Sequence, residues 1–172
     1  MESINVKQVT RTALLIALTL AFQSMGLQQM ITGPVVNMLL FLGVVLVGPW
    51  GAAITGLITP IMALWVGILK PPLAPMVPAI ALGNAIMCIL FGALSRTMPK
   101  TPIVGRVAGV AVGSVVKFLV LTGTVRYLVQ VPPPIAAAMG SIQLVNALLG
   151  GAAALVMAEI LARTGLTTSG KR

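Results

Sequence analysis

Residues 77–95 read V-P-A-I-A-L-G-N-A-I-M-C-I-L-F-G-A-L-S, a continuous apolar segment without a charged side chain. A helix that crosses the hydrocarbon core of a bilayer needs about 20 residues of this kind. Asn84 is the polar residue in the interior of the segment. The stretch therefore predicts a transmembrane helix that carries one buried amide.

Five more apolar segments flank this one, at residues 12–30, 34–47, 50–69, 104–129 and 135–163. Proline-rich breaks at residues 71–72 and 132–134 separate neighbouring segments, because proline lacks an N–H donor and disfavours helix in the residue before it. The pattern predicts an all-α integral membrane protein with six transmembrane helices, in which residues 1–172 form a single domain.

The composition excludes several other classes of protein. Hydrophobic residues make up 58% of the chain and charged residues 8%, whereas soluble domains contain about 25% charged residues. The chain has two acidic residues and no histidine. Most enzyme mechanisms and metal sites need several such side chains, so we expect neither an enzyme nor a cofactor. Cys88 is the only cysteine, and its apolar neighbours predict a buried, inert thiol.

The cations predict the orientation in the membrane. Eight of the eleven precede the first segment, flank the connection between the fourth and fifth, or lie at or after the end of the sixth: Lys7, Arg11, Arg96, Lys100, Arg106, Arg163, Lys171 and Arg172. Loops rich in Lys and Arg stay in the cytoplasm, so both termini are predicted to be cytoplasmic. The first segment lacks a convincing cleavage site and five segments follow it, so we expect no signal peptide.

Small residues recur at helical spacing in two segments. Ala13, Ala17 and Ala21 share one face of the first, where they form either a docking surface for a membrane partner or an internal helix contact. In the fifth segment the same spacing of residues 105, 109 and 113, all glycine, predicts internal packing.

The alanine-striped first segment beside a basic N-terminus resembles the substrate-binding S components of energy-coupling factor (ECF) transporters. The stretch G-P-W-G-A-A-I-T-G-L-I-T-P at residues 48–60 resembles the same family. The resemblance implies six helices, a vitamin or micronutrient ligand, a membrane coupling protein that docks on the alanine strip, and two cytoplasmic ATPases. The metal-transporting branch has a histidine near its N-terminus, which this chain lacks, and no pattern here is typical of thiamin, riboflavin or biotin sites.

Polar side chains inside the segments are candidate ligand-binding residues, because polar groups in hydrocarbon are costly. At about 1.5 Å per residue, Lys117 lies about 18 Å below the outer end of its helix. Others are predicted in the outer half or near the midplane, and the full set of substrate-binding candidates is Gln23, Asn37, Asn84, Lys117, Gln143 and Asn146. The inner halves are mostly apolar, which predicts a pocket open to the outside and closed beneath.

Each candidate has a structural alternative. Lys117 either binds the ligand or is satisfied by backbone carbonyls, and Asn84 and Asn146 either contact the ligand or bond between helices. Arg126 lies nearly opposite Lys117 on its helix and is expected to snorkel to the interface. Glu159 and Arg163 have the spacing of a helical ion pair.

The leading hypothesis is an S subunit that captures a small, anionic vitamin-like ligand for ATP-driven uptake. No intramembrane acid lies at the depth of Lys117, so its ammonium group must deprotonate, reach water or meet an anion. We expect an anionic group of the ligand beside it; the alternative is a neutral ligand whose carbonyl accepts from the lysine. No nucleotide-binding motif is present, so the energy must come from partner subunits. The alternatives are a self-contained small transporter or channel and, more distantly, a scaffold without a ligand.

Overall fold

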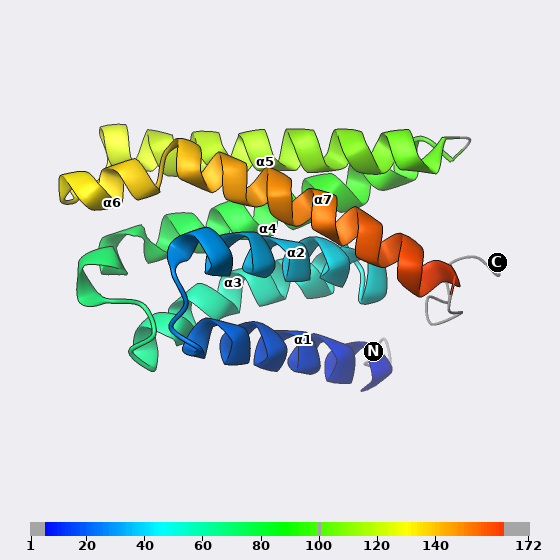
Figure 1. The fold of residues 1–172 in the computed structure, drawn as a ribbon, viewed down its shortest axis with the longest axis horizontal. Helices are drawn as coiled ribbons and strands as arrows, with labels where there is room; N and C mark the ends of the chain where they lie inside the picture. Colours follow the sequence, from blue (N-terminus) through cyan, green and yellow to red (C-terminus); the bar gives the residue numbers. More distant parts are fainter. Residues whose placement is uncertain (1–5, 100, 164–172) are drawn as a thin grey trace, which may run out of the picture.

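The computed structural model describes residues 6–99 and 101–163, which are helical apart from their connections and contain no strand. Six long helices form a bundle (Figure 1). Their bounds are α1 Val6–Ser24, α2 Gln29–Leu46, α3 Pro49–Trp65, α4 Val77–Thr97, α5 Pro102–Tyr127 and α7 Ser141–Arg163. Two short elements complete the fold, the 3-10 helix η1 Pro71–Met76 before α4 and α6 Pro133–Ala138 before α7. The predicted all-α architecture is confirmed.

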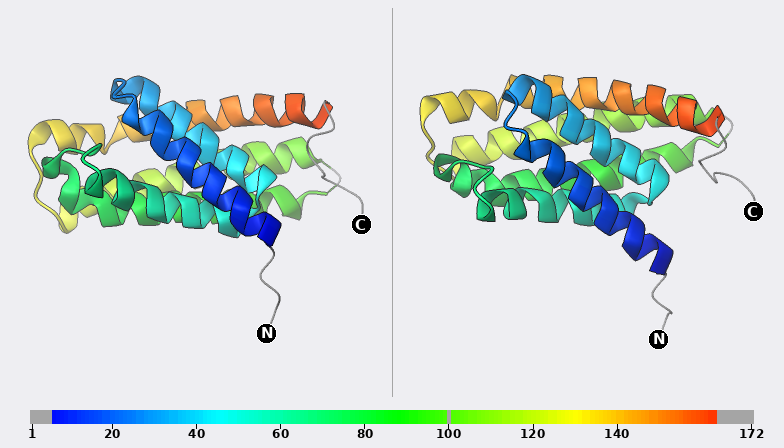
Figure 2. Two further views of the ribbon diagram at one scale, coloured as in Figure 1. Left: turned by 90° about the horizontal axis from the view of Figure 1, so that it is seen from below. Right: turned by 60° about the horizontal axis from the view of Figure 1, so that its bottom comes forward.

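Helix α1 lies at the edge of the bundle, where it packs chiefly against α3 and α2. The two further views show it on the outside (Figure 2). The most extensive contacts join α4 to α5, α2 to α7 and α3 to α4. Helix α1 begins and α7 ends at the same end of the bundle (Figures 1 and 2), which we call the basal end, and the opposite end is the distal end.

Four helical segments of the described chain are long and apolar enough to cross a membrane: residues 29–46, 71–97, 102–127 and 133–163. Helix α3 is also apolar but has 17 residues, and α1 carries Lys7 and Arg11 in its first two turns. Helix α2 begins at Gln29, before the predicted start at Pro34. Pro34 therefore lies inside the helix and does not begin it. Neighbouring helices in membrane proteins make such prolines tolerable.

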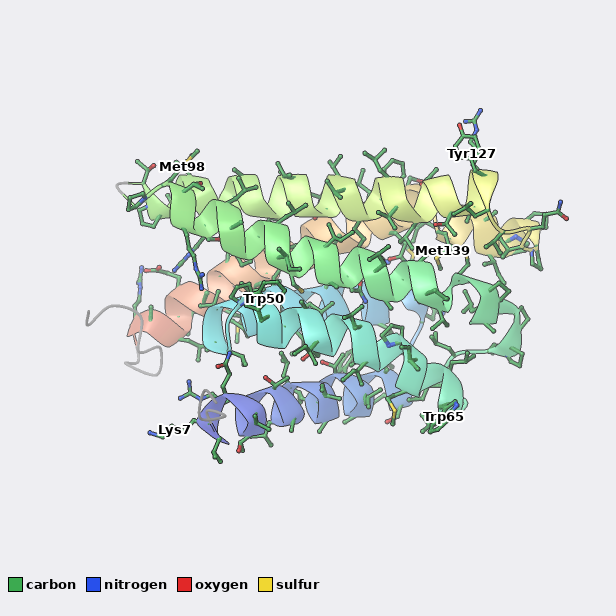
Figure 3. All side chains as sticks on the ribbon, turned by 180° about the vertical axis from the view of Figure 1, so that it is seen from behind. Lys7, Trp50, Trp65, Met98, Tyr127 and Met139 are labelled. Atoms are coloured by element: carbon green, nitrogen blue, oxygen red, sulfur yellow. The ribbon has the colours of Figure 1, made fainter. Side chains whose placement is uncertain are left out.

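Exposed aromatic residues mark both ends of the bundle. Trp50 is the second residue of α3 and Trp65 is its last, and both are exposed. Figure 3 places Lys7 and Met98 at the basal end and Trp65 and Tyr127 at the distal end. Tryptophan and tyrosine favour the two interfaces of a bilayer, so their positions agree with helices that cross it. Arg126 is exposed beside Tyr127, with its guanidinium 5.8 Å from the ring centre, as expected for a cation at the interface.

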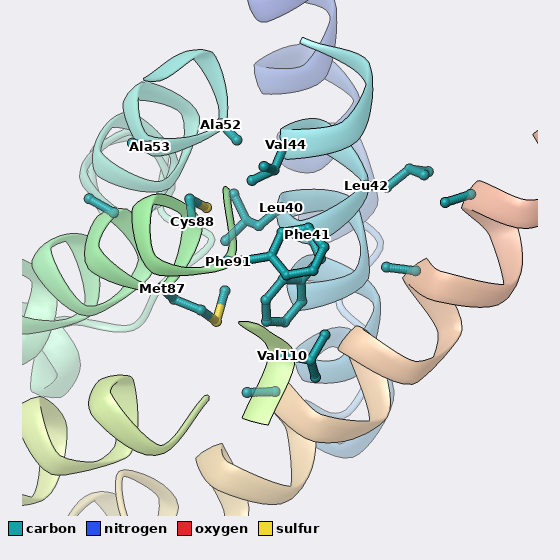
Figure 4. Packing of buried hydrophobic residues seen from close by; sticks show 14 residues of the cluster. Leu40, Phe41, Leu42, Val44, Ala52, Ala53, Met87, Cys88, Phe91 and Val110 are labelled. Atoms are coloured by element: carbon teal, nitrogen blue, oxygen red, sulfur yellow. The ribbon is translucent and has the colours of Figure 1, made fainter. Parts of the chain in front are cut away.

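A close-packed apolar core fills the basal half of the bundle (Figure 4). Phe41 of α2 and Phe91 of α4 meet edge to face with their ring centres 5.0 Å apart. Cys88 is buried in the same core, as predicted. Beside it, α5 approaches α4 through glycines: a Cβ at Gly109 would lie 2.9 Å from the Phe91 ring and 3.1 Å from its backbone. Internal packing of this glycine row is confirmed.

Candidate ligand-binding pocket

A cavity of about 510 Å³ occupies the distal half of the bundle, between the six long helices α1, α2, α3, α4, α5 and α7. It receives five of the six residues that the sequence predicted for ligand binding, namely Gln23, Asn37, Asn84, Lys117 and Gln143. These side chains come from five helices and are separated by up to 120 positions in the sequence (143 − 23). The fold therefore gathers most of the intramembrane polar groups around one space.

Lys117 of α5 is the charged residue in the depth of this cavity, with 3% of its surface exposed. Its Nζ donates a hydrogen bond of 2.7 Å to Oδ1 of Asn37 on α2. Asn37 in turn donates from Nδ2 to the carbonyl oxygen of Gly33 at 2.8 Å. Because a carbonyl can only accept, the bond to Gly33 fixes the amide with its oxygen toward the ammonium group. Asn37 thus holds Lys117 in place.

The lysine stem passes close to the backbone of α4. A Cβ at Gly83 would lie 3.3 Å from Cγ of Lys117, which is closer than most such contacts. Glycine at this position therefore leaves room for the lysine between α4 and α5.

Asn84 of α4 is buried, with 3% of its surface exposed. Its Nδ2 lies 3.4 Å from the carbonyl oxygen of Gly56 on α3, to which it donates. Its Oδ1 has no hydrogen-bond partner in the structure, and neither has Oε1 of Gln23 on α1. Both residues line the cavity. An unpaired buried acceptor costs free energy, so these oxygens favour a ligand that donates to them.

Asn146 does not line the cavity. It is buried on α7 against Gly33 of α2, where a side chain larger than hydrogen at position 33 would collide with it. Its Nδ2 also lacks a partner. Asn146 therefore lies at the α2–α7 contact, but its Nδ2 does not make the interhelical hydrogen bond that the alternative interpretation predicts.

The mouth of the cavity lies between two connections at the distal end. Leu27 comes from the connection of α1 to α2, and Ile68 and Lys70 come from the segment between α3 and η1. Gln29 and Lys70 are exposed, so the lining extends from the buried Lys117 to the surface.

Sequence reasoning missed several lining residues, among them Thr32, Val36 and Lys70. Thr32 and Val36 are one helical turn apart on α2. The predicted start of this helix at Pro34 hid their common face. Only a prediction that this helix begins before Pro34 would have placed Thr32 and Val36 on one helical face.

The charge around the cavity is positive. Lys117 and Lys70 line it, and its described lining contains no carboxylate. Glu159 is far along α7 at the basal end, where its Oε1 lies 3.2 Å from Nε of Arg163 and both side chains are exposed. This confirms the predicted helical ion pair. Glu2 lies outside the described residues.

The alanine strip of α1 is exposed along its whole length, at Ala13, Ala17 and Ala21. Leu15 and Thr19 on the other face of the helix are buried. At the basal end a groove of about 410 Å³ separates α1 from the start of α3, and its lining includes Ala13, Ile16 and Trp50. In the described chain, the three alanines of the strip are therefore exposed, and Ala13 borders the groove beside α3.

Comparison with known proteins identifies the family. The model of the family described as ECF transporter, substrate-specific component, matches residues 7–162, which is most of the chain. The protein belongs to this family. Searches of curated proteins and of solved structures gave no significant match. As an ECF substrate-specific component, the chain is a multi-pass, all-α membrane protein and a transporter subunit. The recognition of the chain as an ECF substrate-specific component is confirmed.

Proposed function

We propose that this ECF component captures a vitamin or related micronutrient from outside a prokaryotic cell and releases it inside through ATP-driven partner subunits. The observation that carries the proposal is the cavity at the distal end, which gathers five polar side chains from five helices above a closed apolar core. A cavity with apolar walls and a few converging polar groups is the usual form of a small-molecule site.

The distal end faces the outside in this proposal. Described cations at the basal end include Lys7, Arg11, Arg96, Arg106 and Arg163, whereas Lys70 and Arg126 lie near the distal end. An excess of cations marks the cytoplasmic side of a membrane protein. Both termini are then cytoplasmic, and the chain acts as one membrane domain.

The core beneath the cavity supports a binding subunit more than a channel. A channel needs a polar path through both halves of the bundle, but the buried side chains below Lys117 include the Phe41–Phe91 pair and Leu40. Release of the ligand to the cytoplasm therefore requires a movement of the subunit, and a membrane coupling protein with two cytoplasmic ATPases supplies it. We propose that the coupling protein docks on Ala13, Ala17 and Ala21, since small residues let helices approach closely in lipid.

Co-expression tests this proposal against a self-contained transporter. The tagged chain is expressed with and without ECF coupling and ATPase subunits, purified in detergent, and reconstituted into proteoliposomes. We expect the partners to co-purify with the chain, and uptake of labelled vitamins to need both the partners and ATP. Uptake by the chain alone would overturn the proposal and favour a solitary transporter.

A further inference from the structure

The hydrogen-bonding groups that remain free in the cavity restrict the chemistry of the ligand. Two buried groups are fixed by their own contacts: the Lys117 ammonium by Asn37, and the Asn84 amide by the Gly56 carbonyl. Resting on the proposed function, we propose that the ligand is an aliphatic monocarboxylate that also carries a hydroxyl or amide N–H group. The carboxylate binds Lys117, and the hydroxyl or N–H donates to Asn84.

The anionic group follows from the donors of Lys117. An ammonium group has three N–H donors, and the structure uses one of them on Asn37. The remaining donors face a cavity whose described lining contains no carboxylate. A buried ammonium without an anion is costly, and a ligand carboxylate removes that cost with charge-assisted hydrogen bonds.

The single negative charge follows from the same lining. Lys117 is the buried cation of the cavity, and the other lining cation, Lys70, is exposed at the mouth. The lining contains no arginine to bind a phosphate group in a bidentate manner. One buried lysine balances one carboxylate, whereas a phosphate monoester would keep excess negative charge in the cavity.

The donor group follows from the orientation of Asn84. Its Nδ2 is committed to Gly56, so its unpaired Oδ1 can only accept. Oε1 of Gln23 is a second unpaired acceptor in the same lining. A ligand with an O–H or N–H group satisfies such an oxygen, but an ether or a hydrocarbon does not.

The aliphatic body follows from the apolar walls. They consist of aliphatic side chains: Leu27, Val36, Pro60, Ile68, Leu69, Leu73, Ile80 and Met139. No aromatic side chain is among the residues that line the described cavity. Sites for flat aromatic ligands gain affinity from ring stacking, and this site offers no ring.

The test uses matched probes on the purified full-length chain in lipid nanodiscs. The probes are ω-hydroxyalkanoates of increasing length, their primary amides, ω-methoxyalkanoates, ω-hydroxyalkyl phosphates and hydroxymethylbenzoates. Affinity is measured by isothermal titration. We expect hydroxyalkanoates to bind about 10- to 100-fold more tightly than their amides, and about 2- to 10-fold more tightly than the methoxy compounds.

Variants assign each preference to its residue. Lys117→Met is expected to abolish the preference for the carboxylate over the amide, and Lys117→Arg to retain part of it. Asn84→Leu is expected to abolish the preference for the hydroxyl over the methoxy group. Arg126→Met, which removes an exposed cation on the same helix as Lys117 but outside the lining of the cavity, is the matched control and should keep both preferences. Thermal unfolding of each ligand-free variant shows that it is folded.

Several outcomes would overturn the inference. These are equal binding of amides and carboxylates, tighter binding of phosphates or benzoates, and a carboxylate preference that survives in folded Lys117→Met. Binding of neutral or aromatic vitamins in place of these probes would reject the ligand class and leave the S-subunit function intact. Failure of every probe and vitamin to bind, together with failure to co-purify with coupling subunits, would reject both.

Discussion

The two halves of the bundle use the same six helices for opposite purposes. In the basal half, Phe41 and Phe91 fill the centre, and glycines such as Gly109 bring helix backbones together. In the distal half the helices surround a cavity of about 510 Å³, and buried oxygens of Gln23 and Asn84 have no partner. Close packing stabilises a fold, and unpaired buried polar groups destabilise it. The basal half therefore supplies the stability with which the distal half maintains an open binding site.

The largest expected effect separates ligand binding from coupling. Ala17→Trp places a large ring on the exposed face of α1, which we propose as the docking surface. Uptake and co-purification with the coupling protein should be abolished, while ligand affinity of the isolated chain should stay unchanged. Transport assays in proteoliposomes and titration of the isolated subunit measure the two properties.

Ala111→Trp is the control for this prediction, because Ala111 is an exposed alanine on α5. It should retain uptake. Loss of folding or of ligand binding in Ala17→Trp would mean that the strip is part of the internal packing.

The next effect concerns the core of the basal half. Phe91 is 1% exposed, and truncation of such a side chain costs about 3–5 kcal/mol of unfolding free energy because it leaves a cavity. Phe91→Ala should lose about this amount in detergent unfolding experiments. Leu73→Ala, at the half-buried wall of the distal cavity, should lose clearly less. Equal losses would show that the two halves are packed alike.

A smaller effect compares two glycines of α5. An alanine Cβ at Gly109 would lie within 3.1 Å of the Phe91 backbone, whereas one at Gly123 would meet nothing within 4 Å. Gly109→Ala should cost about 1–3 kcal/mol through overpacking. Gly123→Ala should be neutral or stabilise by up to about 1 kcal/mol, because alanine favours helix. The same unfolding assay measures both, and a destabilised Gly123→Ala would contradict the difference between the halves.

The smallest effect is expected at the basal surface. Glu159 and Arg163 form an exposed ion pair, and such pairs contribute about 0.3–0.5 kcal/mol. Glu159→Gln should therefore change the unfolding free energy by no more than this, and high salt should remove the difference. A loss comparable to that of Phe91→Ala would show that the pair supports the fold.

Burial depth and hydropathy were sufficient to predict the helices and most of the pocket. Lys117 and Asn84 were found because an ionisable or amide side chain in a long apolar segment has few structural reasons to be there. The depth of Asn146 made it a candidate for ligand binding in the same way. Depth along a helix, however, does not determine which side chains face a cavity. Its position against Gly33 depends on how α7 rotates against α2.

Residues at the mouth were beyond sequence reasoning for a different reason. Lys70 lies in a connection, where no helical periodicity relates it to Lys117. Thr32 lies in a turn of α2 that precedes a proline, where the pattern alone suggested a loop. The bond between Lys117 and Asn37 spans 80 positions. Only the fold, in which α2 and α5 both pack against α4 and α7, brings the two residues together.

The placement of the two tryptophans gives the protein a pair of intrinsic optical reporters. Trp50 and Trp65 are the only indoles in the sequence, and they stand at opposite ends of α3. Trp50 lines the groove beside Ala13 at the basal end, so its emission should respond to a protein that covers the α1 face. Trp65 lies three residues before Ile68, the first residue of the segment at the mouth of the cavity. Its emission should therefore change when a ligand enters there. With Trp50→Phe and Trp65→Phe, each signal can be recorded alone, and the order of ligand capture and partner docking can be timed in one unlabelled molecule.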